Sequence, residues 1–258
     1  GSEMCIRDSK KGWDEIREAR RKRMAKMGII DSNTDFAEWE NRKWDELTEQ
    51  EKDQVAYRMA VYAAQVHCVD YNIGKLIDCL KKNHKMDNTL ILFMSDNGAC
   101  AEPYEELGGG KMEEVNNPAS SFAPTYGRAW AQVSNTPFRK YKCRAYEGGI
   151  STPLILSWKG ALGNKKGKWC RVPGYLPDIM PTILEATGAK YPETYHGGNK
   201  IYPLVGSSLF PAVHKKTDSL HEYMYWEHQN NRAIRWRDWK AICLLYTSPS
   251  PRDPKTSR

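Results

Sequence analysis

Residues 88–98 read Asn-Thr-Leu-Ile-Leu-Phe-Met-Ser-Asp-Asn-Gly, a short apolar run that ends in a polar turn. Its five consecutive apolar residues, 90–94, do not alternate with polar ones. A short apolar run of this kind is typical of a strand buried in a parallel sheet. The run ends at Asp96-Asn97-Gly98, and ligands of open α/β sheets bind beyond the carboxyl ends of the strands. We therefore expect functional side chains at this turn.

A long amphipathic helix is predicted before this strand. Residues 48–51, Thr-Glu-Gln-Glu, match the capping box that starts many helices. Apolar side chains then follow at steps of three and four residues: Val55, Met59, Tyr62, Val66, Val69, Ile73, Leu76 and Leu80. One continuous stripe predicts a helix that packs on a core. A coiled coil would show the same spacing, but the buried strand that follows favours a core-facing helix of an α/β domain.

The other predicted elements are shorter and are separated by long loops. Two of these loops are expected at 99–136 and 190–220. The expected elements are a basic helix over 10–27, a second strand over 153–158, a helix over 175–187 that ends at Gly188, and short aromatic strands at 223–227, 232–235 and 239–242. The last three strands predict an antiparallel meander.

The composition is that of a globular chain. Its 258 residues are 40% hydrophobic and 11% aromatic, which excludes disorder throughout and allows a large core. Its most apolar run is far shorter than the roughly 20 residues of a membrane-spanning helix. The seven cysteines are odd in number and form no CxxC pair, which argues against a disulfide framework or a zinc site. We expect most of them to be buried as small apolar residues.

The net charge is +7, from 39 Lys and Arg against 32 Asp and Glu. Much of the excess lies in the predicted basic helix near the N-terminus. Such a cluster suits a nucleic-acid or membrane patch, or simply a solvated helix face. We favour the solvated face, because no zinc-finger, RNP or GxxG element accompanies the cluster.

The turn after the first strand offers hard oxygen ligands. The Asp96 carboxylate and the Asn97 amide suit Ca²⁺ or Mg²⁺, although the same triplet is also a common turn sequence. Context comes from residues 135–153, where Lys142 precedes Glu147-Gly148-Gly149 and the second strand. We expect Glu147 to be structural and the two glycines to let the backbone turn into that strand.

These segments resemble the signatures of the type I sulfatases, which belong to the alkaline-phosphatase-like superfamily. The matching segments occur in the family order, at 71–76, 87–98, 135–153, 177–182, 206–209 and 226–235. The resemblance implies an α/β fold, a partial alkaline-phosphatase-like mixed sheet flanked by helices. It further implies that residues 10–215 are the C-terminal part of the catalytic domain and residues 216–243 the start of a small antiparallel subdomain. Residues 1–9 and 244–258 read as unrelated tails, because they do not continue the neighbouring patterns.

The resemblance also implies roles for single residues. Asp96 and Asn97 correspond to ligands of a divalent cation, usually Ca²⁺ and possible for Mg²⁺, and Lys142 to the lysine that contacts the sulfate oxygens. His228 and Arg232 fall in a stretch that approaches the substrate pocket in relatives. The implied partner is a small-molecule or carbohydrate sulfate ester, with no nucleic acid or membrane. The implied location is periplasmic or secreted, and the oligomeric state stays open.

The chain departs from the family at the nucleophile, a formylglycine made from Cys or Ser in a C/S-x-P-S-R motif. Neither Cys143 nor Cys170 has that context, and Ser248-Pro-Ser-Pro-Arg252 has the wrong order. We therefore expect the chain by itself to be inactive and to hold metal weakly. Two alternatives stay open. Phosphodiesterases and phosphonate hydrolases of the same superfamily share the metal and lysine arrangement, and a basic binding module is the other possibility.

Overall fold

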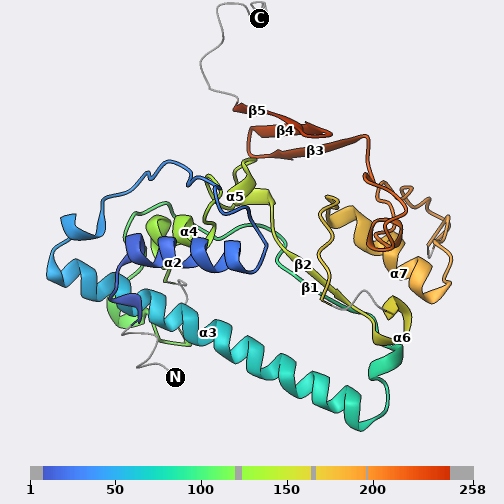
Figure 1. The fold of residues 1–258 in the computed structure, drawn as a ribbon, viewed down its shortest axis with the longest axis horizontal. Helices are drawn as coiled ribbons and strands as arrows, with labels where there is room; N and C mark the ends of the chain where they lie inside the picture. Colours follow the sequence, from blue (N-terminus) through green and yellow to red (C-terminus); the bar gives the residue numbers. More distant parts are fainter. Residues whose placement is uncertain (1–7, 120–123, 164–166, 196, 245–258) are drawn as a thin grey trace, which may run out of the picture. The chain divides into compact units, whose positions relative to one another are not determined.

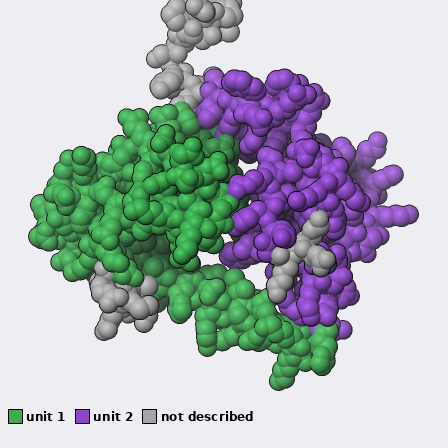
Figure 2. All heavy atoms as spheres, viewed as in Figure 1, with its two compact units in different colours: residues 1–84, 94–153 green, residues 85–93, 154–258 purple. Residues whose placement is uncertain are grey.

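The computed structural model describes residues 8–119, 124–163, 167–195 and 197–244. Its contacts divide the chain into two compact units, shown in Figure 2. The described parts of residues 1–84 and 94–153 form unit 1, and those of residues 85–93 and 154–258 form unit 2. This grouping differs from the predicted division at 215/216, which stays a prediction.

Unit 1 is mainly helical. It contains α2 (Trp13–Lys26), the 3-10 helix η1 (Trp44–Glu46), α3 (Glu49–Lys82), the 3-10 helix η3 (Met112–Glu114), α4 (Gly127–Ser134) and α5 (Glu147–Ile150) (Figure 1). Unit 2 contains the 3-10 helix η2 (Met86–Asn88), most of β1 (Ile91–Met94), β2 (Leu154–Ser157), α6 (Lys159–Leu162), the 3-10 helix η5 (Leu176–Asp178), α7 (Ile179–Thr187), α8 (Phe210–Val213), β3 (Tyr223–His228), β4 (Asn231–Trp236) and β5 (Trp239–Leu244). Helices and two small sheets thus make up an α/β chain.

Most of the two predicted tails lies outside the described residues. The boundaries shift slightly where the structure does describe them. Ser9, predicted to belong to the first tail, is buried in unit 1. Leu244, predicted to begin the second tail, pairs with Asn231 as the last residue of β5.

A cluster of tryptophans forms the core of unit 1. The Trp13 ring meets the Trp44 and Trp130 rings edge-on, with centroids 5.1 and 5.8 Å away. Trp130 is completely buried and donates its indole N–H to the Val55 carbonyl at 2.9 Å. This hydrogen bond satisfies the polar edge of a ring whose faces are in apolar contact. The cluster therefore joins α2, α3 and α4 at one point.

The basic helix α2 forms as predicted, but some of its arginine side chains contact other groups of unit 1. The Arg17 guanidinium stacks on the Phe36 and Trp39 rings at 4.6 and 4.5 Å and donates to the Ala37 carbonyl. Arg21 donates to Glu18 of the same helix. Because these cations already have partners, they add little to a surface that would attract nucleic acid, and the basic binding module loses support.

Helix α3 begins where the sequence predicts. Thr48 Oγ1 accepts a hydrogen bond from the Glu51 N–H, and the Glu51 carboxylate accepts one from the Thr48 N–H. Its apolar stripe is buried only near this end, where Val55 is completely inaccessible, whereas Val66 and Leu76 are 50% and 66% exposed. The prediction of a core-facing helix is therefore correct for the first turns and wrong beyond them, because the core of unit 1 reaches only this end of α3.

The segment predicted to be a loop, 99–136, contains the core helix α4. Its residues Ala129 and Trp130 are completely buried. The helix is only eight residues long and starts with glycine, so the sequence gives no clear periodic signal. A helix this short depends on tertiary packing rather than on propensity.

Arg58 of α3 binds the backbone on the N-terminal side of α4, within the same segment 99–136. Its guanidinium donates to the carbonyls of Gly109, Gly110 and Thr125 at 2.6, 2.8 and 2.7 Å. Burial lowers the pKa of Arg58. The three carbonyl oxygens replace the water that the buried charge has lost, so the segment is held by a charged group and not only by apolar contact.

Strands β1 and β2 pair in an antiparallel order, which corrects the predicted parallel arrangement. Asp87 precedes β1 and contacts Lys159, which follows β2, at 2.7 Å. Ser95 follows β1 and accepts a hydrogen bond from Thr152, which precedes β2. The start of each strand therefore lies beside the end of the other. An antiparallel return needs no crossover helix between the strands.

The burial of this strand pair also differs from the prediction. Phe93 is 49% exposed and Ile155 is 58% exposed. Among the described residues the sheet has only these two strands, so each strand has one edge without a neighbouring strand. The apolar run 90–94 predicts a strand that is covered on both faces, as in a larger sheet, whereas Phe93 in this run is half exposed.

A buried carboxylate organises the first part of unit 2. Asp178 is completely inaccessible, and its oxygens accept hydrogen bonds from the Tyr175 and Ser207 N–H groups at 2.8 Å. The His221 Nε2 lies 2.8 and 3.0 Å from the two oxygens. These contacts compensate for the burial of the carboxylate. The adjoining helix α7 ends at Gly188 in a left-handed conformation, as predicted.

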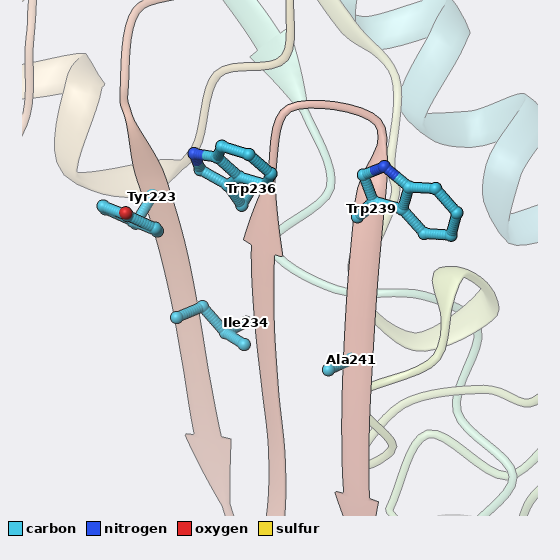
Figure 3. A pocket seen from close by; sticks show the side chains of 5 residues that line it. All are labelled: Tyr223, Ile234, Trp236, Trp239 and Ala241. Atoms are coloured by element: carbon cyan, nitrogen blue, oxygen red, sulfur yellow. The ribbon is translucent and has the colours of Figure 1, made fainter.

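The predicted meander is confirmed as β3, β4 and β5. Its register places Tyr223, Trp236 and Trp239 side by side, and Ile234 next to Ala241. These five side chains line a shallow apolar hollow of about 400 Å³ on one face of the sheet, shown in Figure 3.

The expectation of buried cysteines is wrong for the residues that the structure describes. Cys68, Cys79, Cys170 and Cys243 are exposed, and Cys100 and Cys143 are partly exposed. The first two lie on the part of α3 beyond the core, which explains their exposure. All six of these described cysteines are free thiols.

Replacing Trp130 by alanine should lower the free energy of unfolding by about 3–5 kcal/mol, because a fully buried ring and its hydrogen bond to Val55 are lost. Denaturant unfolding followed by circular dichroism would measure this change. The matched control is Trp239→Ala, since that ring is 76% exposed and its loss should change the free energy by less than about 0.5 kcal/mol. Equal losses in the two variants would contradict the description of the core.

Candidate functional site

Two segments far apart in the sequence are joined at the end of β1. The Gly98 N–H donates to the Gly149 carbonyl at 2.9 Å, and the Lys142 N–H donates to the Ala99 carbonyl at 3.0 Å. All four residues lie in unit 1. The turn that carries Asp96 and Asn97 is therefore attached through its backbone to the segment that carries Lys142.

Side chains reinforce this junction. Asn135 Oδ1 accepts a hydrogen bond from the Ala99 N–H, and Asn135 Nδ2 donates to the Lys140 carbonyl, both at 3.0 Å. Ser95 Oγ donates to the Asn97 carbonyl at 2.8 Å. The amide of Asn135 thus bridges the two segments, while the serine closes the turn after β1.

The junction depends on glycine because the two backbones approach closely. A Cβ atom at Gly98 would lie 1.7 Å from the Gly148 carbonyl oxygen, and one at Gly148 would lie 2.1 Å from the Lys140 carbonyl oxygen. A Cβ at Gly149 would meet the Arg144 carbonyl oxygen at 2.0 Å. The glycines are therefore needed for space, which refines the expectation that they permit a turn.

The Lys142 ammonium lies in a small polar cluster. Its Nζ donates to Glu102 Oε2 at 2.7 Å and lies 4.0 Å from Cys100 Sγ. Cys100 Sγ lies 3.5 Å from the same oxygen, and Cys143 Sγ lies 3.8 Å from Glu102 Oε1. The Lys142 and Glu102 side chains are 37% and 39% exposed, so the pair is open to solvent.

The contact between these two groups shifts both pKa values. The hydrogen bond from Lys142 is the main cause that lowers the pKa of Glu102, followed by the one from Cys100. The hydrogen bond to Glu102 is the main cause that raises the pKa of Lys142. Both groups therefore keep their charges through the neutral range.

The cations next to Lys142 already have partners. Lys140 and Arg139 both pair with Glu40, and the Arg139 guanidinium also stacks on the Tyr146 ring at 4.9 Å. The Arg144 guanidinium lies over the Tyr104 ring at 5.5 Å. Lys142 differs from Lys140 and Arg139 in that its carboxylate partner, Glu102, is itself partly exposed.

Asp96 and Asn97 lie next to each other on the turn after β1, with Asp96 exposed and Asn97 partly buried. A carboxylate and an amide oxygen fit the hard-ligand chemistry of Ca²⁺. Ca²⁺ takes about six to eight oxygens, of which these side chains can supply only a part. Within the described ranges, no group of three or more His, Cys, Asp and Glu side chains is placed to hold a metal.

His228 and Arg232 lie in unit 2 on the β3–β4 hairpin. Arg232 forms an ion pair with Glu227 on the neighbouring strand, with an N–O distance of 2.8 Å. His228 lies opposite Asn231 in the strand register, next to the turn of the hairpin. Successive side chains of a strand point to opposite faces, so His228 projects from the face opposite Glu227 and Arg232. A pocket against one face of this hairpin can therefore contain only one of the two predicted residues.

The chain is similar to known proteins over most of its length. The family model described as Sulfatase matches residues 14–189. The chain is 34% identical over 251 residues to an uncharacterized sulfatase of Schizosaccharomyces pombe. This alignment covers 90% of this chain and 44% of that protein. The chain belongs to the sulfatase family.

Two further relatives of this sulfatase-family chain are named as an arylsulfatase and a steryl-sulfatase. It is 31% identical over 208 residues to an arylsulfatase of Klebsiella aerogenes, covering 77% of this chain and 44% of that protein. It is 30% identical over 192 residues to the steryl-sulfatase of Homo sapiens, covering 70% and 28%. The chain spans less than half the length of these relatives.

Sulfatases are in general metal-dependent. Across the part of this sulfatase chain that the structure describes, no helix combines the length and the apolarity that crossing a bilayer requires.

The sequence singled out the two segments of this junction but not Glu102, which contacts Lys142. Glu102 lies five residues after Asn97 in a stretch interpreted as loop, so no strand or helix pattern singled it out. The only available signal was a carboxylate close in sequence to the Asp-Asn turn, and that signal is weak without the position of Lys142.

Replacing Gly98 by alanine should disrupt the junction, because its Cβ would fall on the Gly148 carbonyl. We expect the free energy of unfolding to fall by about 1–3 kcal/mol, as at other positions where an added group has no space. The control is Gly74→Ala on α3, where nothing lies within 4 Å of the added Cβ and alanine should stabilise the helix by about 0.5–1 kcal/mol. Thermal melts of both variants would test this pair, and destabilisation by both would contradict it.

The carboxyl of Glu102 should titrate below the ordinary value of a glutamate, since its pKa is lowered by Lys142 and Cys100. The stability that this pair contributes is present above the unfolded pKa and is lost as the pH falls through the lowered pKa. NMR titration of the Glu102 side-chain carbonyl carbon would measure the midpoint. Lys142→Met should move the midpoint up, and an unchanged midpoint would show that Lys142 is not the cause.

Proposed function

We propose that this chain supplies the cation and anion contacts of a sulfate ester hydrolase that acts on aryl or carbohydrate sulfates. The single observation that carries the proposal is the backbone junction between the turn with Asp96 and Asn97 and the segment with Lys142. Membership of the sulfatase family and the similarity to an arylsulfatase support the same reaction class.

The proposed roles follow from the charge of the substrate. A sulfate ester spreads one negative charge over its free oxygens, and more charge develops on the leaving oxygen as the S–O bond breaks. A fixed ammonium directed at those oxygens stabilises this charge in the transition state. We assign this role to Lys142, whose raised pKa keeps it protonated at neutral pH.

The assignment of a metal rests on oxygen chemistry. Asp96 and Asn97 are the residues that would hold a divalent cation, for which we propose Ca²⁺ with Mg²⁺ as the alternative. When bound, such a cation supplies Lewis-acid stabilisation to a sulfate oxygen. The role of Asp96 in this proposal is to provide negative charge and a hard oxygen at a turn fixed by Gly98.

The substrate contacts from unit 2 are also a proposal. Either His228 or Arg232 would line the pocket, and their opposite orientations make one of them the contact residue. The Arg232 guanidinium is engaged by Glu227, whereas His228 stands at the exposed end of the hairpin.

We further propose that the 258 residues by themselves do not turn over arylsulfates and hold metal weakly. No Cys or Ser of the sequence stands in the C/S-x-P-S-R context from which the family makes formylglycine. Loss of a nucleophile costs on the order of 10⁶ in rate in other covalent hydrolases. The periplasmic or secreted location stays a prediction from the family resemblance.

A chimera tests whether these residues can serve in a sulfatase site. Residues 91–153 of this chain would replace the matching segment of the Klebsiella aerogenes arylsulfatase, and hydrolysis of 4-nitrophenyl sulfate would be measured. We expect the chimera to be active, and Lys142→Met within it to lower kcat/KM by about 10²–10³, because one charge-stabilising donor is lost.

The matched control is Lys111→Met in the same segment, since Lys111 is exposed and its removal should leave the rate unchanged. Equal rates for the two lysine variants in a folded, active chimera would overturn the role of Lys142. Turnover of 4-nitrophenyl sulfate by the purified 258-residue chain would overturn the proposed inactivity.

A further inference from the structure

We propose that Glu102 is a specificity-determining residue that makes the Lys142 site favour singly charged anions over doubly charged ones. The inference rests on the proposed function, because it concerns the anion that Lys142 binds. It goes further by giving the chain a means to distinguish sulfate esters from phosphate monoesters.

The first argument is the fixed position of the carboxylate. Glu102 Oε2 lies 2.7 Å from the Lys142 ammonium, and the Cys100 and Cys143 thiols contact its two oxygens at 3.5 and 3.8 Å. The S–H group of a cysteine is a weak hydrogen-bond donor, so the two cysteines help to orient the carboxylate. Any anion that reaches Lys142 therefore approaches a negative charge held next to it.

The second argument is that, among the residues that the structure describes, Lys142 is the one cation in contact with this carboxylate. Lys140 and Arg139 are both paired with Glu40, and Arg144 lies over the Tyr104 ring. Lys142 and Glu102 thus form a nearly neutral pair that is partly open to solvent, with 37% and 39% of their side chains exposed. A bound anion must share or displace Glu102 to reach the ammonium.

The third argument is the charge of the two ligand classes. A sulfate monoester carries one negative charge, whereas a phosphate monoester carries nearly two above its second pKa of about 6. The additional charge is repelled by Glu102 at short range. For a partly exposed site, where solvent screens the interaction, we expect this to disfavour the dianion about tenfold.

The test is an NMR titration of the chain with phenyl sulfate and with phenyl phosphate, which share a leaving group and differ in charge. The Lys142 side-chain signals, assigned with a Lys142→Arg variant, report binding. At pH 8 we expect the wild-type chain to bind phenyl sulfate about tenfold more tightly than phenyl phosphate. At pH 5 the phosphate is mostly singly charged while Glu102, with its lowered pKa, is still ionised, so the preference should disappear.

Two variants separate a specificity role from a structural one. Glu102→Gln keeps the shape but not the charge, and should reduce the preference at pH 8 to near unity. Glu102→Asp keeps the charge and should retain a preference of at least a few fold. A wild-type preference that persists in Glu102→Gln would overturn the inference while leaving the anion site intact. If neither ligand shifts Lys142 in any variant, the proposed function fails and the inference fails with it.

Discussion

Two backbones approach closely at the end of β1, and the proposed site depends on this contact. Peptide groups of Gly98 and Ala99 bond to those of Gly149 and Lys142, and no side chain could fit between them. Two short polar motifs, separated by more than 40 residues, are brought to one place by this contact. Without it, nothing that the structure describes would hold the Asp-Asn turn against the segment that carries the lysine.

Around this junction, unit 1 is held together by polar groups as much as by its tryptophans. Arg58 gathers three carbonyls of the segment after the turn, and Asn135 bridges the two halves of the junction. Such fully partnered polar side chains fix an irregular backbone that has no helix or sheet of its own to satisfy its peptide groups. The site is therefore carried by irregular backbone whose order comes from buried hydrogen bonds, next to a helical core anchored on Trp130.

Patterns within a few neighbouring residues predicted most helices and strands. Features that depend on contacts between distant parts of the sequence could not be predicted from these patterns. The capping box at Thr48 and the aromatic alternation of β3 to β5 are encoded within a few residues, so α3 and the meander were predicted correctly. Helix α4 was missed because its stability comes from burying Trp130, and the β1–β2 direction was wrong because an apolar run does not specify its partner. Motif resemblance pointed to Asp96, Asn97 and Lys142, whereas the backbone bonds that join their segments are known only from the tertiary structure. Glu102 had no pattern, since its importance follows only from lying beside Lys142.

The backbone nature of the junction has an evolutionary consequence. Peptide hydrogen bonds do not change when the side chains beside them do, so positions 96, 97 and 142 are free to vary in chemistry while the glycines keep the frame. A lineage could alter charge or metal preference at these positions through single substitutions, without passing through an unfolded ancestor. Diversification of the anion handled by such a scaffold would then be limited by the glycines far more than by the residues that touch the ligand.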